Sequence, residues 1–559
     1  MGIVFPKWNI LNESSADIED ILLDNREITD KEGFFEPSLD KLCDPFLFAD
    51  MEKVLIRFAL AKEKQEKIVI YGDYDVDGIT SAILLRDILV DFGIAEVDVY
   101  IPHRVNDGYG LSDKYFDKFK EDGVSLVVTV DNGISAVNEV NKIKKMGIDI
   151  IVTDHHEPHD CVPNCLIINP MVKGSKYPDL SICGVGVCFK ILQAFSIKYP
   201  EVFNQEYLIS KLDLVVLGTV ADMGCMLGEN RILVTNGLKA LGNTKRPVLK
   251  HLMKFSDIDL SAISVQDIGF KIAPKINAAG RMESALLSFE ALSCMDYNKA
   301  LDYVFALQDL NSKRQDSIKS MSAKYSKKVD NSLNYILVRD DEFNPGLIGL
   351  LSASLSREYS RPCFVLCKNG DDYVGSARIP DIDLNLVKII GKMSKYLKYY
   401  GGHKGAAGFT VLSGKIEQFE GALEDYFSTE VDLNDMEGSL KIDTYLDAEN
   451  INMNLLKRNM KLGPFGEGNK EPIFLVRGLM IDRINKVGKD KTHLQITLKK
   501  GSVTLRAIAF NFSKHCNFLE KHKAEQKTFD CAVELKINRW NGNEFLDLCI
   551  IDVDVKDNL

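Results

Sequence analysis

The chain has 559 residues, 45% of them hydrophobic and 27% charged, a composition typical of globular proteins with sizeable cores. This length predicts three or four domains at about 100–200 residues each. No apolar run approaches the roughly 18 residues of a membrane-spanning helix, and the acidic start does not resemble a signal or transit peptide. We therefore expect a cytoplasmic protein with no membrane partner. The net charge of −12 argues by itself against nucleic acid as a partner.

The charge is unevenly distributed, however. Residues 477–559 contain 15 Lys and Arg against 11 Asp and Glu, and the stretch 311–328 is also locally basic. Local charge, rather than the total, steers a polyanion. These two segments therefore keep nucleic acid open as a partner.

The 12 cysteines are scattered through a chain without a signal peptide. Reduced and mostly buried thiols are the expectation for this compartment. Cys161 and Cys165 have no second Cys or His pair at zinc-finger spacing, so they give only a weak indication of zinc.

The first half of the chain alternates strand and helix patterns. Residues 1–45 predict an irregular cap with a short helix near 15–24, and residues 50–66 predict a helix. Five apolar strand segments follow, namely "KIVIYGD", "VDVYIPHR", "SLVVTVDNG", "IDIIVTDHH" and "CLIINP". Such alternation predicts a parallel sheet with helices on both faces, whose strand carboxyl ends form the ligand crevice.

The second half predicts a helical connector, a second α/β lobe and an all-β domain. The turn-rich segment 461–472 indicates a junction, and beyond it alternating strands surround a Gly-Ser and an Asn-Gly turn. Short strands with a basic bias predict a small OB-like barrel. Phe510, Phe512 and Trp540 are candidate base-stacking residues there, with core packing as the favoured alternative. The predicted domains are 1–45 (cap), 46–282 (first α/β lobe, catalytic), 283–330 (connector), 331–455 (second α/β lobe, substrate-binding) and 456–559 (barrel).

Acidic and imidazole side chains gather at the predicted strand ends. A lone Asp-x-Asp is more often a solvated loop, but several such groups converge here. Carboxylates in a crevice are costly unless a cation neutralises them. Carboxylates with one or two imidazoles suit Mn²⁺ or Mg²⁺, and this many ligands could hold two ions about 3.5–4 Å apart. The residues are Asp73, Asp75, Asp77, Asp131, Asp154, His155, His156 and Asp222, the last following "LVVLGTVAD" and grouped with the strand ends.

These segments resemble the successive motifs of the DHH phosphoesterase superfamily, and in particular the RecJ family of single-strand-specific DNA exonucleases. The resemblance extends over roughly 50–559 and keeps the order of the motifs. The segments that carry it are "YGDYDVDGIT", "VTVDNGIS", "TDHH", "GTVADM", "APKINAAGRM", "ALQDLNSKRQ", "GSAR", "GGHKGAAG" and "GPFGEGN".

The resemblance implies a 5′→3′ exonuclease that degrades single-stranded DNA to 5′-mononucleotides with Mn²⁺ or Mg²⁺, in repair and recombination. It also implies that a helicase and a single-strand-binding protein act with the enzyme. His156 would contact the scissile phosphate or assist the attacking water, and Asp73 and Asp154 would support the metal ligands. The implied metal ligands are Asp75, Asp77, Asp131, His155 and Asp222.

The resemblance also indicates residues that bind the strand. Arg281 could pair a phosphate through two hydrogen bonds, the alternative being a salt bridge to a helix end. Arg378 and His403 lie on glycine-flanked backbone, which allows close approach of an anion. Tyr109 could stack on a base or simply pack in a turn. The full implied set is Tyr109, Asn277, Arg281, Arg314, Ser376, Arg378 and His403.

Four positions depart from the family pattern. Lys275 replaces an arginine and lacks its planar fork, so a two-bond contact there is in doubt. Asn344 lies in "FNPGLIGL", where a Trp-His start is expected. Ala377 replaces a glycine and Asp107 replaces a glutamate. None of these positions is an expected metal ligand, so we expect an active enzyme.

Three rival functions remain at this stage. A DHH enzyme for short oligonucleotides or cyclic dinucleotides would share the metal site but lack the barrel and the "NAAGR" segment. A catalytically inactive scaffold would not need the intact acidic motifs. A manganese pyrophosphatase would be much shorter and would leave the basic C-terminal region unexplained.

Overall fold

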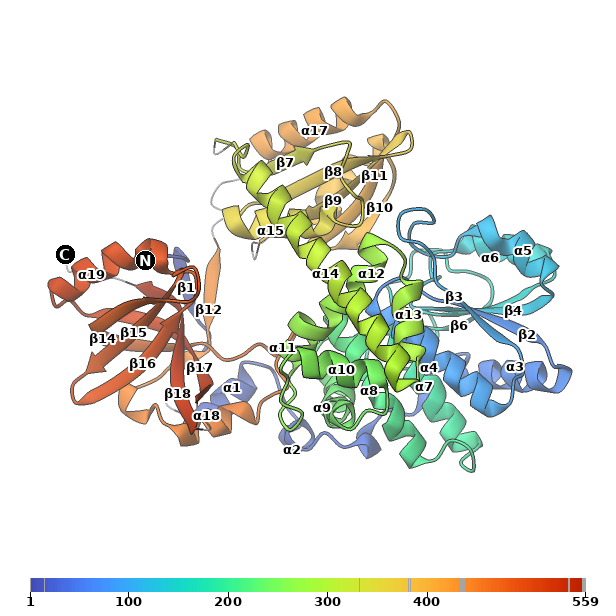
Figure 1. Cartoon of the computed structure of the whole chain (residues 1–559), viewed down its shortest axis with the longest axis horizontal. Helices are drawn as coiled ribbons and strands as arrows, with labels where there is room; N and C mark the ends of the chain where they lie inside the picture. The colour runs from blue at the N-terminus through green and yellow to red at the C-terminus, as the bar shows by residue number, and fades with distance from the viewer. Residues whose placement is uncertain are drawn as a thin grey trace.

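The computed structural model describes residues 2–14, 16–330, 332–380, 382, 384–431, 438–540 and 543–554. Figure 1 shows two α/β lobes bridged by one long helix, with a β-barrel domain on the opposite side of the molecule. This arrangement confirms the fold class expected from the sequence. Within the described ranges, no helix has both the length and the apolar character required to cross a bilayer.

The first lobe is built on a five-stranded, fully parallel sheet with the order β3-β2-β4-β5-β6. Its strands coincide with the five segments expected from the sequence. β2 and β4 are almost entirely buried, as parallel strands with helices on both faces must be. The strands are β2 (Lys67–Tyr71), β3 (Val97–Tyr100), β4 (Val124–Val130), β5 (Asp149–Thr153) and β6 (Leu166–Ile168).

Helices cover both faces of this sheet and continue into a helical layer beneath it. α4 and α7 are apolar on nearly all sides because they lie between the sheet and the helices that follow. The helices are α3 (Met51–Lys64), α4 (Val76–Phe92), α5 (Phe116–Glu121), α6 (Val137–Lys145), α7 (Gly184–Lys198), α8 (Gln205–Ala221), α9 (Gly228–Gly242), α10 (Pro247–Phe255), α11 (Val265–Asp267), the π-helix η4 (Ile268–Ile272), α12 (Ala273–Met282) and α13 (Leu286–Ser293), with the short 3₁₀ turn η3 (Asp113–Tyr115) before α5.

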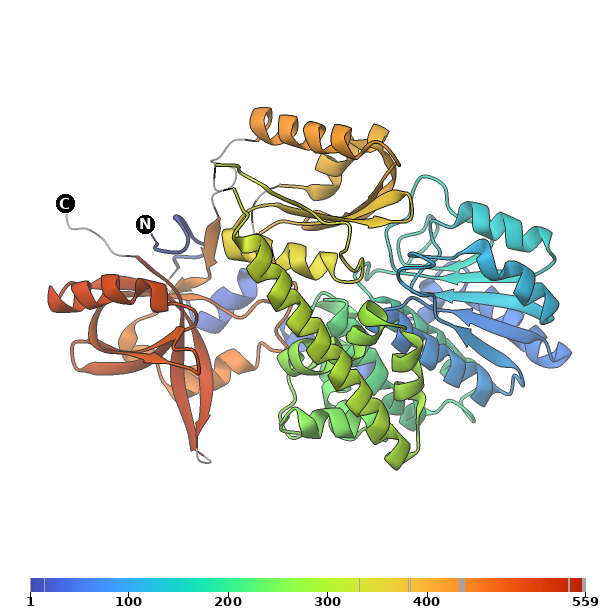
Figure 2. The same ribbon diagram turned by 45° about the horizontal axis from the view of Figure 1, so that its top comes forward.

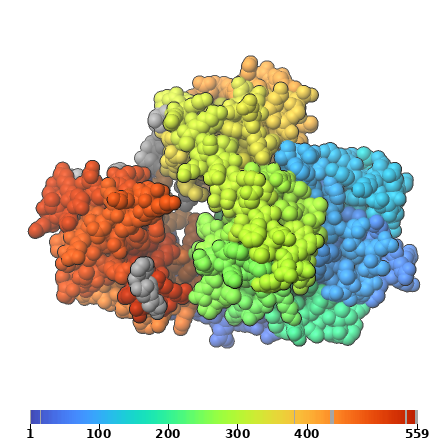
Figure 3. Space-filling view, viewed as in Figure 1, coloured from blue at the N-terminus to red at the C-terminus, as the bar shows by residue number. Residues whose placement is uncertain are grey.

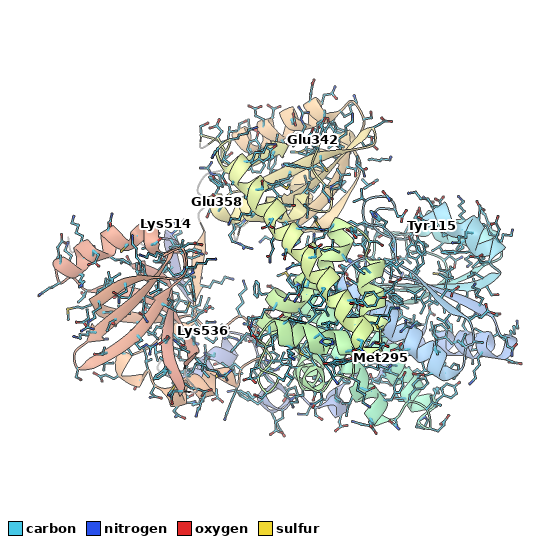
Figure 4. All side chains as sticks on the ribbon, in the orientation of Figure 1. Tyr115, Met295, Glu342, Glu358, Lys514 and Lys536 are labelled. Atoms are coloured by element: carbon cyan, nitrogen blue, oxygen red, sulfur yellow. The ribbon has the colours of Figure 1, made fainter. Side chains whose placement is uncertain are left out.

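The connector is α14 (Tyr297–Ser326), a 30-residue helix. At about 1.5 Å per residue it is roughly 45 Å long, enough to run from one lobe to the other. Figure 2 shows it passing diagonally from the first lobe to the second. Figure 4 places Met295 at its lower end and Glu342 and Glu358 in the second lobe beyond its upper end.

The second lobe is a mixed five-stranded sheet with the order β10-β11-β9-β8-β7, in which only the β7–β8 pair is parallel. One face packs on α16 and α17 and the other packs on α15. Its elements are β7 (Ile336–Arg339), α15 (Ile348–Tyr359), β8 (Cys363–Asn369), β9 (Asp372–Arg378), α16 (Leu386–Lys392), η5 (Ser394–Tyr396), β10 (Leu397–His403), β11 (Ala406–Val411) and α17 (Ile416–Thr429).

The C-terminal domain is a closed five-stranded barrel. Strands pair in the order β14-β15-β16-β18-β17, and β17 pairs again with β14 to complete the circle. Closure leaves no free sheet edge among these five strands. Its elements are β12 (Ser439–Ile442), β13 (Thr444–Tyr445), η7 (Ala448–Asn450), α18 (Met453–Met460), β14 (Phe474–Val487), β15 (His493–Lys500), β16 (Val503–Ala509), η8 (Ser513–His515), α19 (Cys516–Ala524), β17 (Phe529–Trp540) and β18 (Asn543–Asp554).

The N-terminal segment does not form a separate cap, as the sequence suggested for 1–45. Its strand β1 (Lys7–Ile10) pairs in parallel with β12, and helix α1 (Ile18–Asp24) packs its buried face into the barrel core. The buried carboxylate of Asp552 in β18 accepts hydrogen bonds from two N-terminal backbone amides and an indole N–H. The remaining elements are α2 (Lys31–Phe35), η1 (Leu39–Lys41) and η2 (Pro45–Leu47).

The boundary between the second lobe and the barrel also differs from the expected position at 455. β12 and β13 already belong to the C-terminal side, because β12 pairs with β1 and β13 pairs with β14. The second lobe therefore ends with α17 at Thr429. Short strands at 439–445 carry no local signal that identifies their partner, so the sequence alone assigned them to the wrong side.

Candidate metal and phosphate site

The first acidic group lies where β2 passes into α4. Asp73 follows the strand and is buried, and Asp75 caps the helix by accepting a hydrogen bond from the Gly78 amide at 3.1 Å. Asp77 lies in the first turn of α4 and is 1% exposed. A Cβ at Gly78 would lie 2.6 Å from the Asp73 backbone, so only glycine permits this tight passage from strand to helix.

Asp77 is held by the amino-terminal end of α7. Its Oδ2 and Oδ1 atoms accept hydrogen bonds from the amides of Gly184 at 2.7 Å and Val185 at 2.8 Å. The positive end of the α7 dipole therefore faces a carboxylate. Two glycines make room for the acidic side chains. A Cβ at Gly184 would lie 2.7 Å from Asp131 Oδ1, and a Cβ at Gly218 would lie 2.6 Å from Asp77 Oδ1.

Asp131, His155 and Asp222 complete the centre. The Nε2 atom of His155 lies 3.1 Å from Asp131 Oδ1, 3.7 Å from Asp222 Oδ2 and 3.9 Å from Asp77 Oδ2. Both His155 Nε2 and Asp131 Oδ1 are buried and, apart from this 3.1 Å contact with each other, they have no hydrogen-bond partner among the described residues. Asp131 also has a φ of +61°, an unusual conformation for a residue other than glycine and one that recurs at functional sites.

Asp222 reaches the site from a helix, not from a strand end as the sequence suggested. It is the residue that caps the carboxyl end of α8, and its side chain is about a third exposed. The run "LVVLGTVA" before it is apolar on all sides because α8 is buried between other helices. A short, fully apolar run does not distinguish a buried strand from a buried helix.

A second pair, Asp154 and His156, lies beside this centre. Asp154 Oδ1 is 2.7 Å from His156 Nδ1, and Asp154 Oδ2 accepts a hydrogen bond from the Ile134 amide. Burial lowers the pKa of His156, but the hydrogen bond and the charge of Asp154 outweigh it and raise the pKa to about 9. The hydroxyl of Tyr109 lies 3.2 and 3.3 Å from the two ring nitrogens of His156. Tyr109 thus contacts an imidazole, and more than half of its surface remains exposed.

The carboxylates are too close and too buried to be ionised together without a cation. Burial, and then the charge of Asp222, raises the pKa of Asp77 to about 7. Burial, and then the charge of Asp75, raises the pKa of Asp222 to about 7. The pKa values of Asp73 and Asp131 are also well above the ordinary range for the same two reasons. This set of oxygen donors with one imidazole fits Mn²⁺ or Mg²⁺.

The side chains form three groups, and within each group the potential donor atoms all lie within 4.8 Å of one another. One member, the thiol of Cys183, could not be expected from any motif in the sequence. The groups are Asp73, Asp75 and Asp131; Asp131, His155 and His156; and Asp77, Cys183 and Asp222.

Arginines from three parts of the chain gather next to the acidic site. The guanidinium of Arg104 lies 4.2 Å from the ring centre of Tyr74, the residue between Asp73 and Asp75. Burial, and then the charges of Arg104 and Arg314, lowers the pKa of Arg281 to about 9. Burial, and then Arg104, lowers the pKa of Arg378 as well. We call these four residues, Arg104, Arg281, Arg314 and Arg378, the arginine cluster.

No member of the arginine cluster has a carboxylate within 4.0 Å among the residues that the structure describes. Arg281 Nη1 donates only to the Gly346 carbonyl at 3.4 Å, and Arg378 Nη1 donates to Ser376 Oγ at 3.0 Å and the Ala377 carbonyl at 2.8 Å. Asp73 and Asp75 attract Arg104 and Arg281 from farther away, but within the described part of the chain no direct ion pair neutralises the four cations, and a bound anion would relieve their mutual repulsion. Arg104 had appeared in the sequence only as part of a strand end, because no local pattern marks its long-range partners.

The other expected strand-binding residues surround this cluster. Asn277 precedes Arg281 by one turn on α12 and is partly buried. In the second lobe, Arg378 is opposite Ala406, and Ala406 is opposite His403, so Arg378 and His403 share a face of the sheet. On that face, Cβ atoms at Gly401 and Gly408 would meet no atom within 4 Å, which leaves a bare backbone surface.

Three of the four departures from the family pattern have structural explanations. Lys275 Nζ donates to Ser256 Oγ and the Lys271 carbonyl, so it links helices instead of facing the arginine cluster. Asn344 Nδ2 donates to the Arg281 carbonyl at 3.4 Å, which ties the second lobe to α12. Asp107 accepts hydrogen bonds from the His103 amide and the Tyr115 hydroxyl, and so anchors the loop that carries Arg104 and Tyr109. Tyr115 lies on the outer part of the first lobe (Figure 4).

The barrel supplies one exposed aromatic side chain of the three candidates. Phe510 is 54% exposed, whereas Phe512 is buried in the barrel core. The side chain of Trp540 lies outside the described residues.

Comparison with known proteins supports this architecture domain by domain. Residues 67–219 match the family model of the DHH family N-terminal domain, residues 332–429 match the DHHA1 domain, and residues 442–552 match the RecJ OB domain. The DHHA1 match ends at residue 429 and the RecJ OB match begins at residue 442, in agreement with the end of the second lobe at Thr429.

Full-length relatives have the same organisation. The chain is 30% identical to the single-stranded-DNA-specific exonuclease RecJ of Haemophilus influenzae, with 92% of each chain covered. It is 32% identical to RecJ of Bacillus subtilis over 92% of its own length, but spans only 64% of that relative. The crystal structure of RecJ from Thermus thermophilus in complex with Mn²⁺ superposes with a TM-score of 0.79 at 26% identity, covering 97% of this chain and 76% of that one. The chain therefore belongs to the RecJ family of DHH phosphoesterases.

Proposed function

We propose that this chain is a metal-dependent exonuclease that removes 5′-mononucleotides from single-stranded DNA in the 5′→3′ direction. One observation carries the proposal: the arginine cluster lies directly beside the acidic site. Arg104 stacks on Tyr74, which stands between two of the acidic residues, and Arg281 and Arg378 approach Arg104 from the connector side and the second lobe. A strand whose terminal phosphate sits in the cluster would place a neighbouring phosphodiester at the carboxylates.

The acidic site would hold one or two Mn²⁺ or Mg²⁺ ions through Asp75, Asp77, Asp131, His155 and Asp222. Such ions lower the pKa of a water molecule and neutralise charge on phosphoryl oxygens. The buried atoms Asp131 Oδ1 and His155 Nε2 support this assignment, since they lie 3.1 Å from each other and, among the residues that the structure describes, neither forms a hydrogen bond that a cation would have to break. Burial and the charge of His156 lower the pKa of His155, so its imidazole is neutral and its nitrogen can bind a cation.

His156 would act directly on the scissile phosphate. Its raised pKa keeps the ring protonated at neutral pH, so it can donate a hydrogen bond to a phosphate oxygen where negative charge develops. Asp154 fixes the ring through Nδ1 and remains ionised: burial is the largest effect on its pKa, but the hydrogen bond and charge of His156, the charge of His155 and the Ile134 amide together outweigh it and lower the pKa. Asp73, with a raised pKa, would support the site without binding a cation directly.

The arginine cluster would bind the 5′-phosphate. Charge-assisted hydrogen bonds from guanidinium groups suit a terminal phosphate, which carries more charge than an internal one. Ser376 already contacts Arg378, and His403 and Asn277 would complete the pocket from the second lobe and α12. A fixed spacing between this pocket and the acidic site would set the product at one nucleotide.

The remainder of the strand would run toward the barrel. The space-filling view shows a hollow between the barrel domain and the green helices of the first lobe, below the second lobe (Figure 3). The barrel is locally basic and exposes Phe510, features that favour single-strand capture. Enzymes limited to short oligonucleotides or cyclic dinucleotides have no use for such a domain, which is why we favour long single strands.

We further propose a cytoplasmic enzyme of DNA repair and recombination that acts with a helicase and a single-strand-binding protein. A site that accepts only single strands depends on another activity to separate duplex DNA.

A substrate panel tests the proposal. Matched single-stranded DNA, duplex DNA and RNA would be incubated with the protein and Mn²⁺, beside Asp131→Ala and the control Asp117→Ala. Asp117 is an exposed carboxylate on α5, away from the site. We expect degradation of single-stranded DNA only, abolished in Asp131→Ala and unchanged in Asp117→Ala. Equal activity on duplex DNA, or full activity of Asp131→Ala, would refute it.

A further inference from the structure

A buried thiol faces the metal site and has no part in the function proposed above. Cys183 immediately precedes α7 and is 1% exposed. Its sulfur and one carboxylate oxygen each from Asp77 and Asp222 all lie within 4.8 Å of one another. The nitrogen of His155 faces the same two carboxylates, at 3.9 and 3.7 Å.

The backbone directs this thiol toward the carboxylates. Cys183 has the extended conformation of a helix cap, and the next residue, Gly184, donates its amide to Asp77. Behind the sulfur, a Cβ at Gly224 would lie only 2.5 Å away, so glycine leaves just enough room for the thiol. Among the described residues, the thiol has one hydrogen bond to the backbone, a long one of 4.0 Å to the Thr219 carbonyl, and it also contacts the Asp222 carboxylate. A cation bound between the sulfur and this carboxylate would replace the thiol proton.

The donor set on this side of the site differs in kind from the rest. Mg²⁺ and Mn²⁺ prefer oxygen donors, whereas thiolates select Zn²⁺ and other thiophilic cations. One thiolate and two carboxylates supply three of the four donors that a tetrahedral Zn²⁺ site takes, and His155, which lies outside this group of three but faces both carboxylates, is the candidate for the fourth. The Cys183 thiol would release its proton to solvent when it binds.

We propose that Cys183 makes the Asp77–Asp222 side of the site a thiolate–carboxylate site for Zn²⁺, which competes there with Mn²⁺. The proposal rests on the metal-binding role assigned above to Asp77 and Asp222, and it adds a fourth donor that changes which cation binds best. Zn²⁺ held in this way occupies the place of a catalytic ion and inhibits the nuclease.

Cobalt is a spectroscopic probe for this site because Co²⁺ bound to a thiolate shows a charge-transfer band in the near ultraviolet. The metal-free full-length protein would be titrated with Co²⁺, beside Cys183→Ala, Cys183→Ser and the control Cys188→Ala. Cys188 is buried like Cys183, lies within α7, and belongs to none of the three metal-binding groups. We expect the band in the wild type and in Cys188→Ala, and no band in the two Cys183 variants. Circular dichroism would verify that the Cys183 variants are folded.

Zinc competition gives the second readout. Displacement of bound Co²⁺ should require about 10- to 100-fold more Zn²⁺ in Cys183→Ser than in the wild type, the range seen when a metal site loses a supporting group. Co²⁺ that binds the wild type without a thiolate band would overturn the proposal while leaving the oxygen-donor site intact. Failure of Co²⁺ to bind at all would overturn both the proposal and the metal site. Equal Zn²⁺ affinity in the folded Cys183→Ser variant would also refute it.

Discussion

Metal binding should depend steeply on pH, and Asp77 allows the effect to be calculated. Burial and the charge of Asp222 raise the pKa of this carboxyl to about 7, from an ordinary value of 3.8. A protonated carboxyl must lose its proton before it can bind a cation. Acidification from about pH 8 to about pH 5.5 should therefore weaken Mn²⁺ binding.

The expected magnitude follows from the fraction of ionised Asp77. This fraction falls from roughly 90% at pH 8 to roughly 3% at pH 5.5, so Asp77 alone weakens Mn²⁺ binding about 30-fold, or about 2 kcal/mol. Asp73 and Asp131 have raised pKa values as well, so they act in the same direction. Folding without metal has the opposite sign: the contribution of Asp77 to the free energy of unfolding falls as the pH rises from about 4 to about 7, because the folded state holds the proton more tightly than the unfolded chain.

Isothermal titration calorimetry would measure the Mn²⁺ affinity and the number of protons released on binding at each pH. Titrations of Mn²⁺ in two buffers that differ in ionisation enthalpy should show about one proton or more released per site at pH 5.5, and close to none from Asp77 at pH 8. Asp117→Asn is the matched control and should behave as the wild type. An affinity that is the same at both pH values would refute the interpretation of the site as a strained carboxylate cluster.

Three further predictions concern the strand pocket, the lobe contact and the N-terminal segment. Arg281→Gln should reduce the preference of kcat/KM for 5′-phosphorylated over 5′-hydroxyl strands by about 10- to 100-fold, because charge-assisted hydrogen bonds to the phosphate are lost; an unchanged ratio would exclude Arg281 from the pocket. Gly346→Ala should lower both activity and melting temperature, since its Cβ would lie 2.2 Å from the Arg281 carbonyl, whereas Gly421→Ala on α17 meets no atom within 4 Å and should leave activity unchanged and raise the melting temperature slightly, because alanine favours a helix. Asp552→Asn should lower the denaturant midpoint of the barrel domain by the equivalent of about 1.5–3 kcal/mol and speed proteolysis of the N-terminal segment; equal proteolysis rates would show that the segment is held by other contacts.

The local patterns of the sequence were sufficient for most of the fold and the acidic site. Strand and helix periodicity placed the parallel sheet, and the rule that ligands bind at strand carboxyl ends gathered Asp75, Asp131 and His155 in advance. Asp222 was assigned to the same site but to the wrong kind of element, because a short apolar run fits a buried helix as well as a buried strand.

Features that depend on distant partners could not be predicted. The N-terminal strand pairs with a segment more than 400 residues away in the chain, at Ser439–Ile442. Arg104 acquires a role only through Arg281 and Arg378, which come from other parts of the chain. Cys183 lies in a segment without any cysteine motif, and its position facing Asp77 results from the packing of α7 against α4.

The size and origin of the first product test the central claim most directly. Single-stranded DNA labelled at the 5′ end, and separately at the 3′ end, would be sampled at early times with Mn²⁺. If the arginine cluster holds the terminal phosphate beside the acidic site, the 5′ label should appear at once as a mononucleotide, while the 3′ label stays in long products. Early release of the 3′ label, or a first 5′ product longer than one nucleotide, would contradict the account.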